Sequence, residues 1–345
     1  MFRLLDKSWH DFCYMKGEMN FTDNGGIIMG DKQEKRLNLP FTGICTFGKY
    51  PICTDLNNLD ADVAVIGVPN DMGTQWKSGA RMGPRGIREG STLYSFGLEG
   101  AYDIEKDIMY LGPGWDVVDC GDVDMVHGDH EKSLNNAEKD VRKIVEKGAM
   151  PVVLGGDHSI SIPVGKALDS FEKVHVIQID AHLDWADERS GQKNGHGSCI
   201  RRLSEMDHIG EIFQFGIRGI SSSLKEDVDA AKEYGATILS PRQIRKMGIE
   251  EVINQLPEGE NYYVTIDIDG LDPSLAPATG TPSPGGFFYD EVNEMLEGIA
   301  KRGNVIAFDL VEVAPPYDPT GITGQTGARV ALDLLSFVLK EKEDK

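Results

Sequence analysis

One segment decides the fold: Val174-His175-Val176-Ile177-Gln178-Ile179-Asp180-Ala181-His182-Leu183-Asp184. Its first six residues form a mostly apolar run, which is typical of a strand buried on both faces of a parallel sheet. Asp180, His182 and Asp184 follow at a spacing of two residues, so they point the same way while the chain stays extended. The segment therefore predicts a parallel strand whose carboxyl end carries acidic and imidazole groups.

Two other segments repeat this arrangement. The apolar run 150–154 is followed by Gly155-Gly156-Asp157-His158, and the run 262–266 by Asp267-Ile268-Asp269-Gly270-Leu271-Asp272-Pro273. In open parallel sheets, ligand sites form beyond the carboxyl ends of the strands, where groups far apart in sequence converge. We therefore expect the three polar strings to form one site, with Asp272 and Pro273 as turn residues that support it.

The side chains in these strings favour metal binding. Carboxylates with imidazole, and no clustered cysteines, suit borderline-hard ions such as manganese, nickel, cobalt or zinc. A single aspartate after a strand is more often a turn former or a helix cap, so the prediction depends on the whole set. Six ligands, two of them shared, would give each of two ions four protein contacts and leave room for a bridging water.

The rest of the chain alternates predicted strands and helices. Repeated strand, helix, strand units imply a parallel sheet covered on both faces. We therefore predict an α/β fold of three layers, α/β/α, around a central and mainly parallel sheet. Further strands are expected over 62–69, 117–121, 212–217, 237–239 and 305–311, and helices over 84–92, 131–147, from 161, and over 198–206, 224–234, 289–302 and 324–339.

Residues 1–58 differ from the remainder. Their apolar pattern is irregular, and Gly25-Gly26 and Pro40-Phe41-Thr42-Gly43 are typical of turns. We predict an N-terminal extension over 1–58 and one α/β domain over 59–345, a size that can bury a large core. The extension is expected either to wall the site or cover a neighbouring subunit, or to be a surface arm.

Composition excludes several classes of protein. The chain has 35 basic and 56 acidic residues, a net charge of -21, and this argues against binding nucleic acid. No apolar stretch approaches the length of a membrane helix, and the first residues lack the pattern of a signal peptide. Five cysteines without paired spacing suit reduced thiols. We therefore expect a soluble cytoplasmic protein that contacts neither nucleic acid nor membrane.

One dense polar cluster is predicted to lie outside the site. Val126-His127-Gly128-Asp129-His130 precedes a helix and does not close a strand. It is therefore expected to be a solvated loop with a helix N-cap.

The polar strings resemble the signatures of the ureohydrolase family, which includes arginase and agmatinase. Two more strings belong to the resemblance: Asp309-Leu310-Val311-Glu312-Val313-Ala314-Pro315-Pro316-Tyr317-Asp318 is similar to the agmatinase-like branch, and Gly73-Thr74-Gln75-Trp76-Lys77-Ser78-Gly79-Ala80-Arg81-Met82-Gly83-Pro84 to the family's first substrate-side loop. The match runs from about Ala61 to Leu339, with five strings in the family's order. It implies an arginase-like fold and hydrolysis of a guanidino C–N bond to urea and an amine.

The resemblance also assigns roles to the metal ligands. Two aspartates would bridge the ions, and one histidine and one aspartate would complete each shell. Asp184 would in addition carry a proton from the nucleophile to the leaving amine. The ions would be Mn²⁺ by family habit, with Ni²⁺ as the main alternative. The bridges would be Asp180 and Asp267, the first ion would take His158 and Asp184, and the second His182 and Asp269.

Further residues resemble the family's substrate-side groups. Glu312 would accept hydrogen bonds from the substrate guanidinium and orient it. His196 would shuttle protons or hold the substrate at the mouth. Thr74, Trp76 and Phe288 are further candidates for substrate contacts, although packing of Phe287 and Phe288 in the core is an equal alternative.

Substrate and assembly are left open by the resemblance. Ser283 stands where many agmatinases have a glutamate, which argues against a long cationic tail. The run Phe287-Phe288-Tyr289 would suit a compact guanidine, or an alkylated guanidine or biguanide such as metformin, through cation–π contact. The alternatives are an agmatinase or guanidinobutyrase proper, a subunit of a hetero-oligomeric amidinohydrolase, and an arginase-fold deacetylase. The family habit predicts a trimer or hexamer, with a paralogous subunit as one option.

Overall fold

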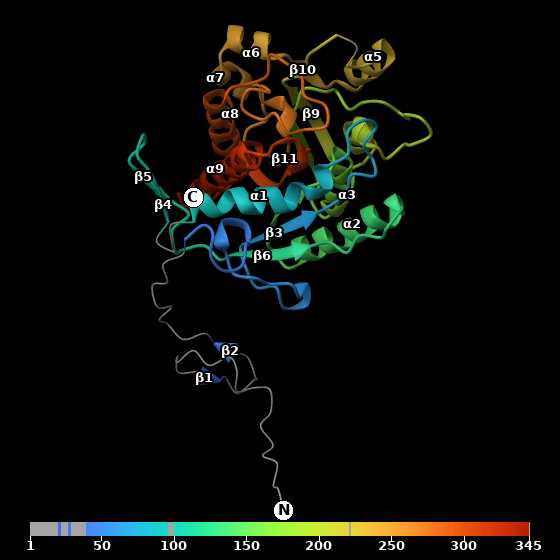
Figure 1. Cartoon of the computed structure of the whole chain (residues 1–345). Coiled ribbons are helices and arrows are strands. Elements are labelled where there is room, and N and C mark those ends of the chain that lie inside the picture. The colour runs from blue at the N-terminus through green and yellow to red at the C-terminus, as the bar shows by residue number, and fades with distance from the viewer. Residues whose placement is uncertain (1–19, 22–26, 29–38, 96–99, 221, 345) are drawn as a thin grey trace, which may run out of the picture. The chain divides into compact units, whose positions relative to one another are not determined.

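The structure is a computed structural model of the chain, and it describes residues 20–21, 27–28, 39–95, 100–220 and 222–344 (Figure 1). The chain divides into two units, Met1–Leu39 and Pro40–Lys345. In the first unit, strands β1 (Asn20–Phe21) and β2 (Ile27–Ile28) pair antiparallel. The second unit carries the sheet and the site.

An eight-stranded sheet forms the middle layer of this second unit. Its strands are β3 (Val63–Val68), β6 (Val117–Asp122), β7 (Met150–Gly155), β8 (Val174–Ile179), β9 (Ile209–Phe215), β10 (Thr237–Leu239), β11 (Asn261–Asp267) and β12 (Asn304–Val311). They lie in the order β10-β9-β8-β11-β12-β7-β3-β6, and each of these pairings is parallel. The predicted parallel α/β fold is therefore confirmed.

Helices cover both faces of this sheet (Figure 1). On one face lie α1 (Gly83–Ser91), α6 (Pro241–Met247), α7 (Ile249–Ile253), α8 (Tyr289–Arg302) and α9 (Ile322–Glu343), and on the other α2 (His130–Glu146), α3 (Ser161–Ala167), α4 (Cys199–Ser204) and α5 (Lys225–Tyr234). Neighbouring strand residues alternate between the two cores: Val152 belongs to the first and Val153 to the second. Because both faces are buried, the strands are continuous apolar runs.

The fold places the predicted ligands together. β7 and β8 follow one another in the chain, but β11 and β12 lie between them in the sheet. The four strands that end in the polar strings are therefore neighbours, and all four carboxyl ends meet at one edge. This crevice is where open parallel sheets bind ligands.

The sequence pattern did not predict four short elements. Helices α6 and α7 are one or two turns long, and β4 (Ala101–Asp103) pairs with β5 (Ile108–Tyr110) in a small hairpin. Elements of this length hold too few residues for a period to show. The last helix also runs on to Glu343, past the predicted end, and its final turn carries Lys340 and Lys342.

The end of the predicted extension contacts the sheet domain. Phe47 is fully buried, and its N–H donates to Asp119 Oδ2 over 2.7 Å. The N–H of Cys53 donates to the carbonyl oxygen of Asp119 over 2.9 Å. The boundary at residue 58 stays a prediction, since residues from Pro40 onward belong to the same compact unit as the sheet.

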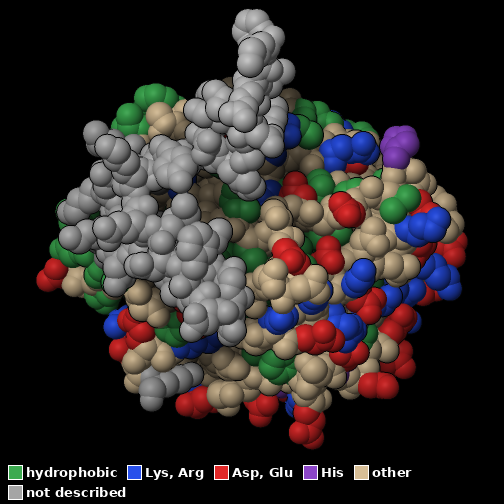
Figure 2. Space-filling model, turned by 90° about the horizontal axis from the view of Figure 1, so that it is seen from below, with side chains coloured by type: hydrophobic (Ala, Val, Ile, Leu, Met, Phe, Trp, Pro, Cys, Tyr) green, Lys and Arg blue, Asp and Glu red, His purple; other side chains and the backbone are tan. Residues whose placement is uncertain are grey.

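The described surface carries charges of both signs. Acidic and basic side chains are interspersed on the face shown in Figure 2. Within the described ranges, each helix is too short or too polar to cross a membrane.

Candidate metal centre

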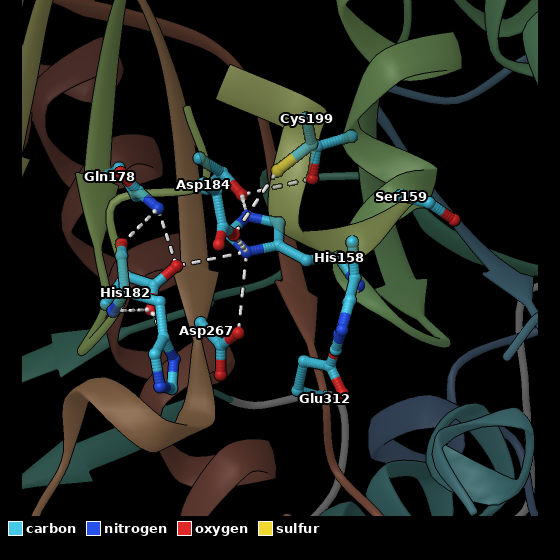
Figure 3. A network of polar contacts seen from close by, with 12 residues as sticks. His158, Ser159, Gln178, His182, Asp184, Cys199, Asp267 and Glu312 are labelled. Carbon is cyan, nitrogen blue, oxygen red and sulfur yellow. Dashed lines mark hydrogen bonds and ion pairs between the residues drawn. The ribbon is translucent and has the colours of Figure 1, made fainter. Parts of the chain in front are cut away.

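His158 lies at the middle of a cluster of carboxylates (Figure 3). Its Nδ1 atom is 2.9 Å from Asp184 Oδ2, 3.1 Å from Asp180 Oδ2 and 3.4 Å from Asp267 Oδ2. The histidine is only 1% exposed. Side chains at or beyond the ends of three strands, β7, β8 and β11, thus meet at one buried nitrogen.

A second histidine shares one of these carboxylates. His182 Nδ1 is 3.0 Å from Asp269 Oδ2 and 3.6 Å from Asp180 Oδ1. Asp180 therefore presents one oxygen to each histidine, as a bridging residue would. The structure brings all six predicted ligands together in two halves: His158, Asp184 and Asp267 on one side, His182 and Asp269 on the other, and Asp180 between them.

Asp267 is placed less symmetrically than Asp180. Its Oδ2 atom faces His158, whereas its Oδ1 accepts a hydrogen bond of 2.8 Å from the N–H of Asp269. A carboxylate oxygen has more than one lone pair, so this bond leaves capacity for a cation. The bridging role of Asp267 stays a prediction.

Asp180, His182 and Asp184 do not converge along an extended chain, so that prediction was wrong. The chain does not stay extended after the strands: the N–H of His182 donates to Asp180 Oδ1 over 2.6 Å, and the chain turns over Ile268–Gly270. Aspartate side chains favour such turns because they bind the N–H two residues on. Tight turns at the strand ends, and not a two-residue period, gather the side chains.

Two of the predicted catalytic residues have an unusual backbone. Asp184 has φ 50° and Glu312 has φ 63°, both in the left-handed region. Non-glycine residues in this region are uncommon, and strained residues cluster at functional sites. The backbone at this edge of the sheet is also tightly packed at Gly156, where a Cβ atom would lie 2.0 Å from the carbonyl oxygen of Asn70.

The carboxylates repel one another in this buried position. Burial and the charges of Asp269 and Asp180 hold the pKa of Asp267 well above its ordinary value. Burial alone would lower the pKa of His182, but the charges and contacts of Asp269 and Asp180 outweigh burial and raise this pKa to about 12. Burial raises the pKa of Asp180, but contacts from His158 and His182 bring it below its ordinary value. The cluster thus attracts positive charge.

The donor set fits two divalent cations. Although three carboxylate oxygens lie within 3.4 Å of it, His158 Nδ1 forms no hydrogen bond with any described group. A cation between these atoms would satisfy the nitrogen and neutralise the carboxylates together. The thiol of Cys199 completes the surroundings and lies 3.5 Å from Asp184 Oδ2.

Glu312 lies beside the cluster with one oxygen occupied and one free. Its Oε1 atom accepts from the N–H of His158 over 3.0 Å and is 2.9 Å from His196 Nδ1. Its Oε2 atom is buried and has no hydrogen-bond partner among the described groups. Burial lowers the pKa of His196, but Glu312 raises it to about 9. The free oxygen is an acceptor that a ligand can use.

The remaining predicted substrate contacts lie further out. The hydroxyl of Thr74 donates to Asp157 Oδ2 over 3.3 Å, beside the N–H of Gly73 at 2.7 Å. The side chain of Trp76 is 66% exposed, and the ammonium of Lys77 lies 4.5 Å from its ring. In the described residues, no hydrogen bond or ion pair joins Trp76 to the cluster. Its role as a substrate contact stays a prediction.

The aromatic run after residue 286 is mostly structural. Phe287 is fully buried in the core, and the hydroxyl of Tyr289 donates to Asp333 over 2.5 Å. Only Phe288 is exposed, at 54%, and it precedes helix α8. The core-packing alternative is therefore correct for Phe287, and Phe288 alone stays a candidate.

Sequence reasoning missed several residues that touch the site. Thr265 stands two residues before Asp267, and Gln178 two residues before Asp180, so a two-residue period along the strands could have found both. The buried histidine of the 126–130 cluster was wrongly expected to be solvated: Asp129 is the predicted N-cap, but His130 Nε2 lies 2.8 Å from the carbonyl oxygen of Asn194. Its position depends on tertiary packing.

An α/β domain with a parallel eight-stranded sheet and a buried, two-part cluster of aspartates and histidines defines the class of protein. The model of the family described as "Arginase family" matches residues 61–336. The chain is 33% identical over 302 residues to the guanidinobutyrase of Pseudomonas aeruginosa, covering 86% of this chain and 92% of the relative. It is 36% identical over 284 residues to the agmatinase of Bacillus subtilis, and the match covers 81% of this chain and 93% of the relative.

Solved structures agree with these relatives. The proclavaminate amidino hydrolase of Streptomyces clavuligerus matches with a TM-score of 0.76 and 28% identity, covering 88% of this chain and 99% of that chain. The chain belongs to the arginase family. It is an agmatinase-like hydrolase of the ureohydrolase type, which acts on C–N bonds of guanidino groups.

Proposed function

We propose that this protein uses two divalent ions to hydrolyse a small guanidino compound to urea and an amine. His158, Asp180, Asp184 and Asp267 would hold the first ion, and His182, Asp269 and the two shared aspartates the second. When bound, the ions lower the pKa of a water molecule and so supply a nucleophile at neutral pH. Mn²⁺ is the proposed metal by family habit, and Ni²⁺ the alternative.

The unpartnered oxygen of Glu312 carries this proposal. A buried carboxylate oxygen without a donor is costly, so its place suggests a ligand that donates hydrogen bonds and carries positive charge. A guanidinium group has N–H donors in a flat fork that matches a carboxylate. Glu312 is held rigidly for this task by His196 and by the N–H of His158.

The chain's own residues would divide the remaining work. Glu312 would hold the guanidinium so that its carbon faces the cluster, which gives the advantage of orientation. Asp184 would accept the proton of the nucleophile and pass it to the departing nitrogen. His196 would keep Glu312 in place and exchange protons with solvent at the mouth.

A compact guanidine or alkylated guanidine is the proposed substrate. The loop 281–286 is fixed tightly over the second half of the cluster: the hydroxyl of Thr281 donates to Asp269 Oδ2 over 3.1 Å, and the carbonyl of Ser283 accepts from Arg218 Nη2 over 2.6 Å. A fixed loop leaves little freedom for a long tail. Trp76 and Phe288 would contact the substrate from the mouth.

Urea release tests the function directly. The protein is loaded separately with Mn²⁺ and Ni²⁺ and assayed with guanidine, metformin, guanidinobutyrate, guanidinopropionate, agmatine and arginine. We expect one compound to exceed the others in kcat/KM, with the compact guanidines first. Glu312→Gln should lower kcat/KM by about a hundredfold while the metal content stays at two ions per chain, because the charge of one charge-assisted contact is lost. If the metal-loaded protein released urea from none of these compounds, the proposal would be contradicted.

Assembly is a separate part of the proposal. We propose a trimer or hexamer, either of this chain alone or with a paralogous subunit. Light scattering on the purified chain gives its mass in solution. A monomer that is fully active would contradict a need for assembly.

A further inference from the structure

A relay of hydroxyl groups links His158 to a buried carboxylate that the function described so far does not use. The second ring nitrogen, His158 Nε2, lies 2.9 Å from Thr265 Oγ1. The hydroxyl of Thr265 in turn donates to Asp309 Oδ1 over 2.7 Å. Thr265 and Asp309 are fully buried, on the neighbouring strands β11 and β12.

The hydrogen bonds to Asp309 come from hydroxyl groups and not from a lysine or arginine. Its Oδ2 atom accepts from Ser161 Oγ over 2.8 Å and from the hydroxyl of Tyr263. Within the described residues, these two and Thr265 are its side-chain donors. A buried carboxylate is retained only when its charge is satisfied in this way or lies near positive charge.

Counting protons along the relay fixes the tautomer of His158. A carboxylate can only accept, so Thr265 spends its single hydroxyl proton on Asp309. The oxygen of Thr265 then offers only lone pairs to His158, and Nε2 must carry the ring proton. In the neutral ring, Nδ1 therefore has a free lone pair, and this is the atom that faces Asp180, Asp184 and Asp267.

We propose that Asp309 is a positioning residue that acts through Thr265 to hold His158 in the Nε2–H tautomer, with Nδ1 preset for the first ion. The inference rests on the proposed function in that it takes His158 as a metal ligand. Groups that orient a ligating histidine typically change metal affinity by about ten- to a hundredfold. Asp309 and Thr265 should therefore set how tightly the buried half of the centre binds its ion.

Matched variants on the two sides of Asp309 test the relay. Thr265→Val removes the relay hydroxyl with little change of shape, and Thr265→Ser keeps it. Tyr263→Phe removes a hydroxyl from the other oxygen of Asp309 and leaves the relay intact. Asp309→Asn offers an amide that can donate to Thr265 and so reverse the direction of the relay. The dissociation constant of Mn²⁺ is measured for each by chelator competition, and the visible spectrum of the Co²⁺-loaded protein gives a second readout.

We expect Thr265→Val and Asp309→Asn to weaken the tighter Mn²⁺ site by about ten- to a hundredfold. Thr265→Ser and Tyr263→Phe should stay within about threefold of wild type, and Co²⁺ spectra should change only in the first pair. Thermal unfolding in excess chelator shows whether each variant is folded. Equal loss in Thr265→Val and Tyr263→Phe, or unchanged affinity in Thr265→Val, would overturn the relay. Mn²⁺ binding without urea release would instead contradict only the proposed function, and no binding by the wild type would overturn the ligand assignment and the relay together.

Discussion

The two halves of the centre share Asp180 but differ in depth. On one side, His158 is 1% exposed, and its second nitrogen is bound to Thr265. On the other, the side chain of His182 is 24% exposed, and the amide of Gln178 donates to the backbone carbonyl oxygen of His182 over 3.2 Å. Interactions are stronger where water is excluded, and a histidine whose ring is fixed loses less freedom on binding.

From this difference we predict that the two proposed ions bind with unequal affinity. The buried half is fixed by its surroundings before an ion arrives, so it should bind first and tightly. The open half can adjust and exchange with solvent, so its ion should be the weaker one and the one affected by substrate. Predictions on each half test this inequality.

The largest effect should come from the residue that both halves share. Asp180→Asn removes the charge that faces His158 and His182 together. We expect urea release to fall by about a thousandfold, roughly 4 kcal/mol in transition-state stabilisation, with loss of at least one ion. Elemental analysis and urea assays check this, with Asp272→Asn as control because that turn aspartate lies outside the cluster. Near-normal metal content and turnover would contradict a bridging role.

Removing each histidine should separate the halves. His182→Ala should leave about one ion per chain, because the buried half stays intact. His158→Ala should weaken both ions, since its loss leaves three repelling carboxylates around one cavity. Metal titration with calorimetry resolves the two affinities. Equal affinity losses in the two variants would show that the halves do not differ.

The pair of His196 and Glu312 makes a pH prediction for the metal-free protein. Glu312 raises the pKa of His196 in the folded protein to about 9, whereas a histidine in the unfolded chain has a pKa of ~6.5. The stability from protonated His196 is therefore fully present below ~6.5, falls as pH rises, and is lost above about 9.

Unfolding temperatures of wild type and His196→Gln in excess chelator measure this stability. We expect the wild type to exceed the variant near pH 6, and the difference to disappear towards pH 9. The N–H of Gln75 lies 3.3 Å from Nε2 and favours the neutral ring, so its contact opposes protonation weakly. A difference that is constant across this range would show that Glu312 does not hold the proton.

The smallest effect should come from Thr281, which touches the open half. Its hydroxyl donates to Asp269 Oδ2 over 3.1 Å. Thr281→Val should weaken the second ion by about three- to tenfold and leave the first unchanged, because one neutral donor to a carboxylate is lost. The same titration that compares the histidine variants checks it. A larger effect on the first ion would contradict the division into halves.

The sequence alone was sufficient for the fold class and for the six side chains that the structure brings together. Apolar runs such as 150–154 and 174–179 predict buried parallel strands, because a strand with apolar side chains on both faces must be packed on both faces. The polar strings at their ends could be interpreted because strand ends in such sheets converge at one edge. The family resemblance then supplied Glu312 and His196.

Only the tertiary structure decided how these groups are arranged. The order β8-β11-β12-β7 places two late strands between two earlier ones, and no local pattern encodes that order. It is this order that sets Thr265 beside Asp309 and both behind His158. A local pattern shows which side chains are buried, but hydrogen bonds between strands that are far apart in the sequence exist only once the chain has packed.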